Sequence, residues 1–177
     1  AQAAEIGTAG VMHLSTLMEN GSFSSLRAEE VLLDPEKAEK LIEETARTMQ
    51  RKGYAGVDVD FEFLGAPLAE AYADFVGALR QTVSRLGGIV IAALAPKTSA
   101  DQPGILYEGH DYAKLARNAD YVLVMSYEWG YTYGPPMAVA PLAAVRRVLD
   151  YAVSEMPPEK IFMGFPNYAY DWTLPYQ

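Results

Sequence analysis

The chain has 177 residues, of which 50% are hydrophobic and 21% charged, a composition typical of a globular protein. Its net charge is −9 and its 14 basic residues form no cluster, which argues against nucleic acid as a partner. No apolar run approaches the roughly 20 residues that a membrane span needs, and the absence of cysteine excludes disulfides and thiolate zinc sites.

Predicted strands and predicted helices alternate along the chain. Apolar runs indicate strands at residues 10–16, 56–63, 89–96, 120–129 and 160–166. Amphipathic patterns and capping residues indicate helices at residues 26–33, 35–52, 67–86, 110–119 and 141–156. In the second of these helices Asp34 is the expected N-cap, Pro35 the first helical residue and Gly53 the stop. Its apolar face comprises Ala38, Leu41, Ile42, Ala46 and Met49.

Five strands alternating with helices predict parallel βα units, which leaves two α/β architectures open: a doubly wound sheet and a TIM (β/α)8 barrel. No glycine-rich dinucleotide fingerprint or P-loop follows any strand, which weakens the first. Polar and aromatic residues instead collect at the ends of strands, where barrel enzymes build their active sites. They are Asp60, Glu62, Lys97, Tyr127, Glu128, Asn167 and Tyr168. A barrel takes about 250 residues, so we expect an incomplete barrel.

The strand "GVDVDFEF" places Asp58, Asp60 and Glu62 at every second position. Alternate residues of a strand share one face and lie roughly 6.5–7 Å apart. In a barrel these three would point inward, whereas Val57, Val59, Phe61 and Phe63 would pack against the outer helices. Because enclosed anions repel one another, at least one carboxyl should have a raised pKa. A carboxylic acid that keeps its proton beside an ionised neighbour is the general acid of glycoside hydrolysis.

Two other interpretations of this strand stay open. Alternating acidic residues can form the solvated face of an edge strand, although parallel βα units leave little wet surface. Aspartates can also bind Mg²⁺ or Ca²⁺, but no further acidic or histidine cluster at another strand end completes a coordination shell. His13 and His110 lie far apart in the sequence and have no companions at metal spacing. We therefore predict neither a metal site nor a cofactor.

The segment "GVDVDFE" resembles the signature Asp-x-x-Asp-x-Asp-x-Glu of glycoside hydrolase family 18, which lies on the fourth barrel strand. The segments "LAPKTSADQPGILYEGHDY", "VMSYEWGYTYGPPMAVAP" and "PPEKIFMGFPNYAYDWTLPY" resemble its bacterial spore-germination branch of cortex-lytic N-acetylglucosaminidases, which often carry LysM modules. The resemblance covers about residues 7–177. It implies a retaining β-N-acetylglucosaminidase whose substrate carries 2-acetamido sugars, either spore-cortex peptidoglycan or chitin-like glycans.

The resemblance also implies residue roles. Glu62 matches the general acid/base, Asp60 the residue that positions the substrate's N-acetyl group, and Asp58 the inner aspartate that shares its proton. Tyr127 matches the tyrosine that bonds the acetamido oxygen, and Met125 the floor of the pocket. Two positions depart from the pattern. Ala55 stands where the signature has its first aspartate, and Glu128 stands where chitinases often have aspartate.

If the signature strand is the fourth of the barrel, the strands predicted here are the third to the seventh. We then expect one catalytic domain over residues 1–177 that is truncated, with the remaining strands and any LysM modules in a parent chain. No basic leader with an apolar core follows Ala1. The branch implies an extracytoplasmic location at the bacterial spore or cell wall, and we expect no membrane span.

Aromatic residues are concentrated in the second half of the chain. Eight of the twelve tyrosines and both tryptophans lie between Tyr121 and Gln177. Since aromatic rings stack on pyranose rings, we predict sugar contacts from the loops that follow the last two strands. The predicted substrate-binding residues are Met125, Glu128, Trp129, Tyr131, Asn167, Tyr168 and Trp172, with Tyr133 and Tyr170 beside them. The competing interpretation for any one of them is packing beneath loops.

Two functions remain open from the sequence. The first is the retaining glycan hydrolase described above. The second is a non-catalytic glycan-binding module or an inactive fragment of such a barrel, since a partial barrel exposes sheet edges.

Overall fold

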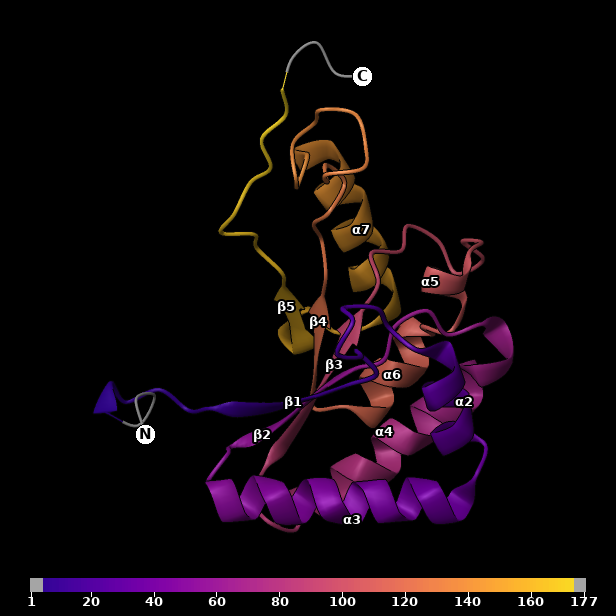
Figure 1. Ribbon diagram of the computed structural model, residues 1–177, viewed down its shortest axis with the longest axis vertical. Coiled ribbons are helices and arrows are strands. Elements are labelled where there is room, and N and C mark those ends of the chain that lie inside the picture. Colours follow the sequence, from indigo (N-terminus) through magenta and orange to yellow (C-terminus); the bar gives the residue numbers. More distant parts are fainter. Residues whose placement is uncertain (1–4, 174–177) are drawn as a thin grey trace.

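The computed structural model describes residues 5–173, which form one parallel sheet with helices packed on it (Figure 1). The strands, paired in the order β1-β2-β3-β4-β5, are β1 Val11–Ser15, β2 Gly56–Asp60, β3 Ile89–Leu94, β4 Tyr121–Val124 and β5 Ile161–Met163. The helices are α2 Ser25–Leu32, α3 Pro35–Lys52, α4 Ala69–Ser84, α5 Ile105–Glu108, α6 Tyr112–Asn118 and α7 Leu142–Glu155. Short 3-10 turns, η1 Ala66–Leu68 and η2 Pro158–Lys160, precede α4 and β5.

The strand order distinguishes the two predicted architectures. A doubly wound sheet reverses its strand order at a switch point, whereas a barrel adds every strand to the same side. Here each strand pairs in parallel with the next one along the chain, without reversal. The helices α3, α4, α6 and α7 all lie on one side of the sheet, to its right and below it in Figure 1. This arrangement is that of a partial (β/α) barrel, as predicted.

The helix α3 shows how directly the sequence specifies some elements. Asp34 caps its N-terminus by accepting hydrogen bonds from the backbone N–H groups of Glu36 and Lys37 (3.1 and 3.2 Å). Gly53 ends it in the left-handed conformation, with φ 70°, which costs glycine little. The predicted apolar face is buried at Ile42, Ala46 and Met49 and half-buried at Ala38 and Leu41. The bounds and both caps are as predicted.

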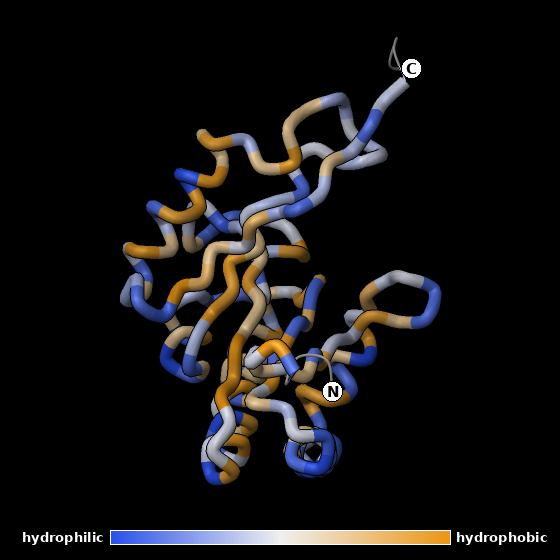
Figure 2. Tube along the Cα trace, turned by 90° about the vertical axis from the view of Figure 1, so that its left-hand side faces the viewer, coloured by the Kyte–Doolittle hydropathy of each residue, from blue (hydrophilic) through white to orange (hydrophobic). Residues whose placement is uncertain are grey.

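The core lies between the sheet and the helices. Val57 and Val59 of β2 are fully buried, and Phe61 stacks against Tyr72 and Phe75 of α4, with ring centroids 5.7 and 5.5 Å apart. Coloured by hydropathy, the strands run as largely hydrophobic segments through the middle of the molecule, while hydrophilic residues mark the outer turns of the helices (Figure 2). The outward face of β2 therefore packs as predicted, except at Phe63.

The strands are shorter than the sequence pattern predicts. The strand β2 ends at Asp60, so Glu62 and Phe63 lie beyond it. Phe63 does not pack against the outer helices: it is 38% exposed, and its ring lies 6.0 Å from that of Phe23. Its φ of 57° is left-handed, which breaks the alternation of side chains on which the prediction depended.

The register brings residues of neighbouring strands into rows across the sheet. His13 pairs with Asp58, Asp58 with Ile91, and Ile91 with Tyr121. Ser15 pairs with Asp60 in the next row on the same face. This face looks away from the helices, so it is the inner face of the partial barrel and carries the two aspartates.

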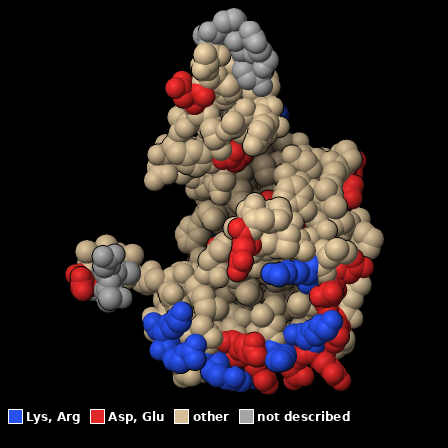
Figure 3. All heavy atoms as spheres, viewed as in Figure 1, with Lys and Arg blue, Asp and Glu red and all other residues tan. Residues whose placement is uncertain are grey.

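Charged groups are unevenly distributed over the surface. In the view of Figure 3, lysines, arginines, aspartates and glutamates gather at the lower edge, where α3 lies, and the upper part carries few charges.

Among residues 5–173, no helix is long and apolar enough to cross a membrane. The last four residues of the aromatic tail, 174–177, lie outside the described range.

Candidate active site

Two aspartates and a histidine form a compact group on the inner face. His13 Nδ1 lies 2.9 Å from Asp58 Oδ2, and its Nε2 lies 3.5 Å from Asp60 Oδ2. A protonated imidazole carries a hydrogen on each ring nitrogen, so it can donate to both carboxylates at once. The shared hydrogen bond or proton expected between Asp58 and Asp60 stays a prediction, whereas the structure places the His13 ring beside both carboxylates.

Sequence reasoning overlooked His13. It has no carboxylate or cysteine companion at metal spacing in the sequence, yet β1 pairs with β2 in a register that puts it directly beside Asp58. The available signal was its position in the predicted strand 10–16, next to the signature strand in the expected sheet order. Adjacent parallel strands bring such residues together.

Burial governs the charge of Asp60. Its side chain is almost enclosed, and the Oδ1 atoms of Asp58 and Asp60 are buried without a hydrogen-bond partner among the described residues. Burial raises the pKa of Asp60 to about 6, His13 opposes the rise, and the charge of Asp58 adds to it. The predicted rise in pKa is confirmed, but its main cause is loss of hydration and not repulsion between the carboxylates.

Glu62 lies just past the end of β2 in a small pocket. This cavity, of about 180 Å³, is lined by Glu62, Pro96, Leu106, Tyr107, Met125, Tyr127, Glu128 and Trp129. Burial, followed by the charge of Asp60, raises the pKa of Glu62 to about 7. The pocket joins Glu62 to four of the residues predicted for the site: Met125, Tyr127, Glu128 and Trp129.

Two non-glycine residues in the left-handed region flank this pocket. Phe63, directly after Glu62, has φ 57°, and Glu128, directly after Tyr127, has φ 69°. Such conformations are unfavourable for residues other than glycine and often occur at functional sites. In both places the chain turns immediately after a side chain that lines the pocket.

Tyr127 is held at the ends of β4 and β5. Ser126 Oγ donates to the carbonyl of Gly164 (3.0 Å), and the Gly164 N–H donates to the carbonyl of Val124 (2.8 Å). A Cβ on Gly164 would lie 2.5 Å from the Tyr127 ring. The glycine is therefore required here for close packing, and it fixes the ring of Tyr127 beside the pocket.

Some predicted sugar-contact residues bond to one another. Glu128 accepts hydrogen bonds from the hydroxyls of Tyr168 and Tyr170, the latter at 3.0 and 2.9 Å. Trp172 Nε1 donates to the carbonyl of Gly134 (3.2 Å). These contacts tie the segment after β5 to the segment after β4, and both segments extend above the strands in Figure 1. These predicted sugar-contact residues therefore bond the two loops to each other.

The remaining predicted contacts differ in exposure. Trp129 is half-buried against the core, while Tyr131 and Asn167 are exposed. Tyr131 meets Tyr133 edge to face, with centroids 6.3 Å apart. Lys97, one of the polar residues predicted at the strand ends, is buried, and its Nζ donates to the backbone carbonyls of Ala100 and His110.

A sequence profile of the glycosyl hydrolases family 18 matches residues 14–176. This chain belongs to that family. The match includes all eleven residues predicted for the site.

Three relatives illustrate the position of this family 18 chain. It is 43% identical to the cortical fragment-lytic enzyme of Bacillus subtilis (strain 168), over 94% of this chain and 38% of that protein. The crystal structure of the spore cortex-lytic enzyme SleL of Bacillus megaterium superposes with a TM-score of 0.92 at 39% identity, covering 99% of this chain and 40% of that one. A chitinase from Chromobacterium violaceum shares the fold, with a TM-score of 0.87 at 24% identity over 94% of this chain and 52% of that one. The chain thus spans about two fifths of the length of its cortex-lytic relatives.

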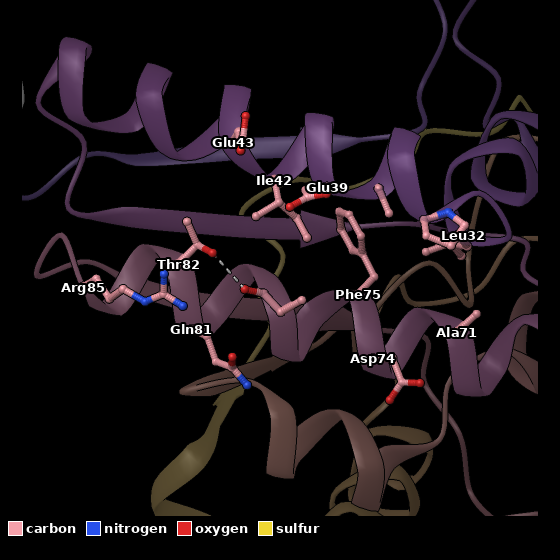
Figure 4. A pocket seen from close by; sticks show the side chains of 13 residues that line it. Leu32, Glu39, Ile42, Glu43, Ala71, Asp74, Phe75, Gln81, Thr82 and Arg85 are labelled. Carbon is pink, nitrogen blue, oxygen red and sulfur yellow. Dashed lines mark hydrogen bonds between the residues drawn. The ribbon is translucent and has the colours of Figure 1, made fainter.

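A larger cavity of the family 18 chain has a different character. It measures about 640 Å³ and lies between α3 and α4, on the helical side of the sheet (Figure 4). Ile42 and Phe75 reach into it from the two helices, and Glu39 and Asp74 lie at its margin. It contains none of the carboxylates of the signature strand. The candidate active site is therefore the smaller pocket around Glu62.

No metal cluster accompanies the carboxylates of the family 18 chain. Within residues 5–173, no group of three or more histidines, cysteines, aspartates or glutamates has a geometry suited to a metal ion. The basic side chain beside Asp58 and Asp60 is that of His13.

Proposed function

We propose that this chain is the catalytic part of a retaining β-N-acetylglucosaminidase that cleaves spore-cortex peptidoglycan or related glycans by substrate-assisted catalysis. The observation that supports it most is that two carboxyl groups, one at the end of β2 and one just beyond it, lie in different environments. Glu62 has a pKa of about 7 in a pocket with Tyr127, while Asp60 sits beside a histidine. Titratable groups with distinct environments are typical of acid and base roles. The relatives named cortex-lytic support the glycan class.

In this proposal the substrate supplies the nucleophile. The 2-acetamido oxygen attacks the anomeric carbon while the glycosidic C–O bond breaks, and Glu62 donates its proton to the leaving oxygen. The oxazolinium ion that forms carries a positive charge. Asp60, as an anion, accepts the amide N–H and stabilises that charge. The Tyr127 hydroxyl donates a hydrogen bond to the acetamido oxygen and aligns it. Glu62 then removes a proton from water while the water oxygen bonds to the anomeric carbon and the bond from that carbon to the acetamido oxygen breaks. The sugar is released with overall retention.

The aromatic loops would hold the glycan. Trp129 offers an apolar ring face in the pocket, and the exposed Tyr131 and Asn167 offer a ring face and a polar group on the loops after β4 and β5. Tyr168 and Trp172 brace these loops. We place the complete protein outside the cytoplasm, at the spore or cell wall, and expect further barrel strands and LysM modules in it. The single catalytic domain over residues 1–177 is part of this proposal.

The second candidate is a glycan-binding module without catalysis. The strand β5 is an edge of the described sheet, where Phe162 and Met163 are each 46% exposed, and His13 on the inner face is also largely exposed. An open inner face could bind glycan yet leave the reacting sugar poorly enclosed. A released-sugar assay beside a binding assay, on this chain and on the complete protein, separates the two: binding with no release by the complete protein would favour the second candidate.

The two pKa values predict a narrow, bell-shaped dependence of kcat/KM on pH. Asp60 must be ionised, so activity should fall as the pH drops below about 6. Glu62 must be protonated, so activity should fall as the pH rises above about 7. The measurement is the initial rate of sugar release at low substrate across this range. A rate that stays constant to about pH 9 would exclude Glu62 as the general acid.

Removing the charge of His13 should shift only the low-pH side of that profile, called the acid limb below, where activity falls because Asp60 becomes protonated. His13→Gln keeps a hydrogen-bond donor beside Asp58 but loses the cation that lowers the pKa of Asp60. Because His13 is largely exposed, we expect the acid limb to move to higher pH by about one unit, the lower end of the effect of a neighbouring charge. His13→Lys, which stays cationic, is the matched control. Equal acid limbs in the wild type and His13→Gln would refute this electrostatic role.

A further inference from the structure

His110 is a fully buried histidine that joins the ends of two strands. Its Nδ1 accepts a hydrogen bond from the backbone N–H of Ala95 (2.8 Å), just beyond β3. Its Nε2 lies 2.9 Å from the backbone carbonyl of Phe61, just beyond β2. Phe61 immediately precedes Glu62, so this histidine contacts the backbone next to the proposed general acid.

The pattern of backbone hydrogen bonds between β2 and β3 shows which bond His110 replaces. At the start of the ladder the Ile89 N–H donates to the Ala55 carbonyl (3.2 Å). Parallel ladders repeat every second residue, so advancing both strands by the same six residues would make the Ala95 N–H donate to the Phe61 carbonyl. The regular pairing instead stops at Val59 and Ala92. The imidazole stands between the two groups that would otherwise bond directly.

The two partners fix the protonation of His110. Ala95 offers only an N–H and Phe61 only a carbonyl, so Nδ1 must be the acceptor and Nε2 must carry the hydrogen. Burial lowers the pKa of His110 to about 4, which keeps this neutral form across the proposed working range. Lys97 is the cation that faces it, with its Nζ on the His110 carbonyl, and Tyr72 packs beside the ring at 5.7 Å.

The loop that carries His110 is also closely fitted. A Cβ added to Gly109 would lie 2.3 Å from Cβ of Leu64 and 2.6 Å from its carbonyl oxygen, so the two segments touch backbone to backbone. On the other side, the Tyr112 hydroxyl donates to the Ala95 carbonyl (2.6 Å) and accepts from the Lys97 N–H (3.0 Å). His110 is therefore anchored on both sides and acts as a rigid insert.

Each of the two residues that His110 bonds is followed by a residue that lines the pocket. Glu62 follows Phe61, Pro96 follows Ala95, and both Glu62 and Pro96 line the 180 Å³ cavity. Strands bonded directly at Phe61 and Ala95 would bring these two residues closer and narrow the cavity between them.

We propose that His110 is a positioning residue: a spacer between β2 and β3 that opens the pocket and sets the direction of the backbone at Glu62. This rests on the proposed function of Glu62 in catalysis. His110 itself does not touch the reacting atoms. It acts through the Phe61 carbonyl, and the bond to that carbonyl should matter more for turnover than the bond to Ala95.

Two substitutions in the complete protein separate these bonds. His110→Gln places an amide N–H near the position of Nε2 and keeps donation to Phe61, while His110→Asn places an oxygen near Nδ1 and keeps only the bond from Ala95. Both should lower the melting temperature. We expect kcat to fall about 10- to 100-fold in His110→Asn with little change in KM, because small misplacements of catalytic groups have effects of this size. In His110→Gln kcat should stay within about threefold of the wild type.

Tyr72→Phe is the matched control. It removes a buried hydroxyl that bonds the Val59 carbonyl (3.4 Å) on the same strand, so it should lower stability without lowering kcat. Equal kcat losses in His110→Asn and His110→Gln, or unchanged kcat in both, would overturn the proposal.

A measurement on the unaltered protein tests the same inference if His110→Asn does not fold. Nitrogen NMR of the histidine ring should show a neutral Nε2–H tautomer that does not titrate between about pH 5 and 8. An Nδ1–H tautomer, or titration near the ordinary histidine pKa, would overturn the proposal. This result is independent of activity. A wild type that releases no sugar would refute the proposed function, whereas an active His110→Asn variant refutes only the role of His110.

Discussion

Glu62→Gln should abolish glycan hydrolysis and leave glycan binding intact. Glutamine matches glutamate in size but cannot donate an acidic proton to the leaving oxygen or accept one from water. General acid–base catalysis contributes about 10²–10⁴-fold to rates, so kcat should fall by at least that range in the complete protein. The pocket should keep its shape, because Met125 and Tyr127 line it independently of this change. The measurement is sugar release from muramic-lactam-containing cortex glycan, with binding measured on the same glycan.

The matched control is Glu43→Gln on the exposed side of α3, which removes an equal charge far from the pocket. It should hydrolyse glycan at the wild-type rate. If Glu62→Gln keeps hydrolysing the cortex glycan, Glu62 is not the acid, and the geometry around Asp58 and Asp60 has to be assigned a different purpose. If both binding and hydrolysis disappear, circular dichroism distinguishes loss of fold from loss of a binding group.

The sequence predicted the local elements well because their signals are local. Asp34, Pro35 and Gly53 each act on backbone within a few residues, so the bounds of α3 follow from them directly. The parallel sheet also followed from the alternation of strands and helices. The strand ends were predicted less well, since Phe63 adopts a left-handed conformation that no neighbouring residue type signals. A valine- and phenylalanine-rich pattern continues past the point where the backbone turns.

The carboxylates of the site were predictable, whereas their partners were not. Asp58, Asp60 and Glu62 stand together in the sequence, so their spacing alone brings them near one another. His13 and His110 reach the same site from distant positions, and only the sheet register and the long loop after β3 place them there. Lacking a pattern of their own, both histidines were judged uninformative. Buried or paired polar groups of this kind depend on tertiary context that a sequence window does not contain.

Glu128 illustrates a further limit of sequence reasoning. Its position after Tyr127 made it a candidate for sugar contact, but its carboxylate accepts hydrogen bonds from Tyr168 and Tyr170. Two loops that follow different strands are thereby connected near the pocket. Clustered aromatic residues in a sequence can therefore signal loops that bind each other as well as loops that bind sugar. The two roles are compatible, since a braced loop presents Trp129 at the pocket in a fixed place.

Asp60→Asn should lower kcat nearly as much as Glu62→Gln does, because it removes a negative charge from the site. The amide has almost the same shape but no negative charge, so it cannot stabilise a positively charged oxazolinium ion. Losing a preorganised electrostatic group of this kind costs about 10²–10³-fold in kcat, and KM should change little because the charge develops only in the transition state. Asp74→Asn, an exposed substitution on α4, is the control with the same change in charge.

A second substrate separates this mechanism from one with a protein nucleophile. A glycan whose 2-acetamido groups have been replaced by free amines offers no oxygen to attack the anomeric carbon. The wild type should bind this deacetylated glycan without cleaving it, and the Asp60→Asn variant should not cleave it either. Cleavage of the deacetylated glycan at a rate close to that of the acetylated one would show that the substrate is not the nucleophile. In that event Asp60, which lies beside Asp58 and His13, would itself be the carboxylate to test as the nucleophile.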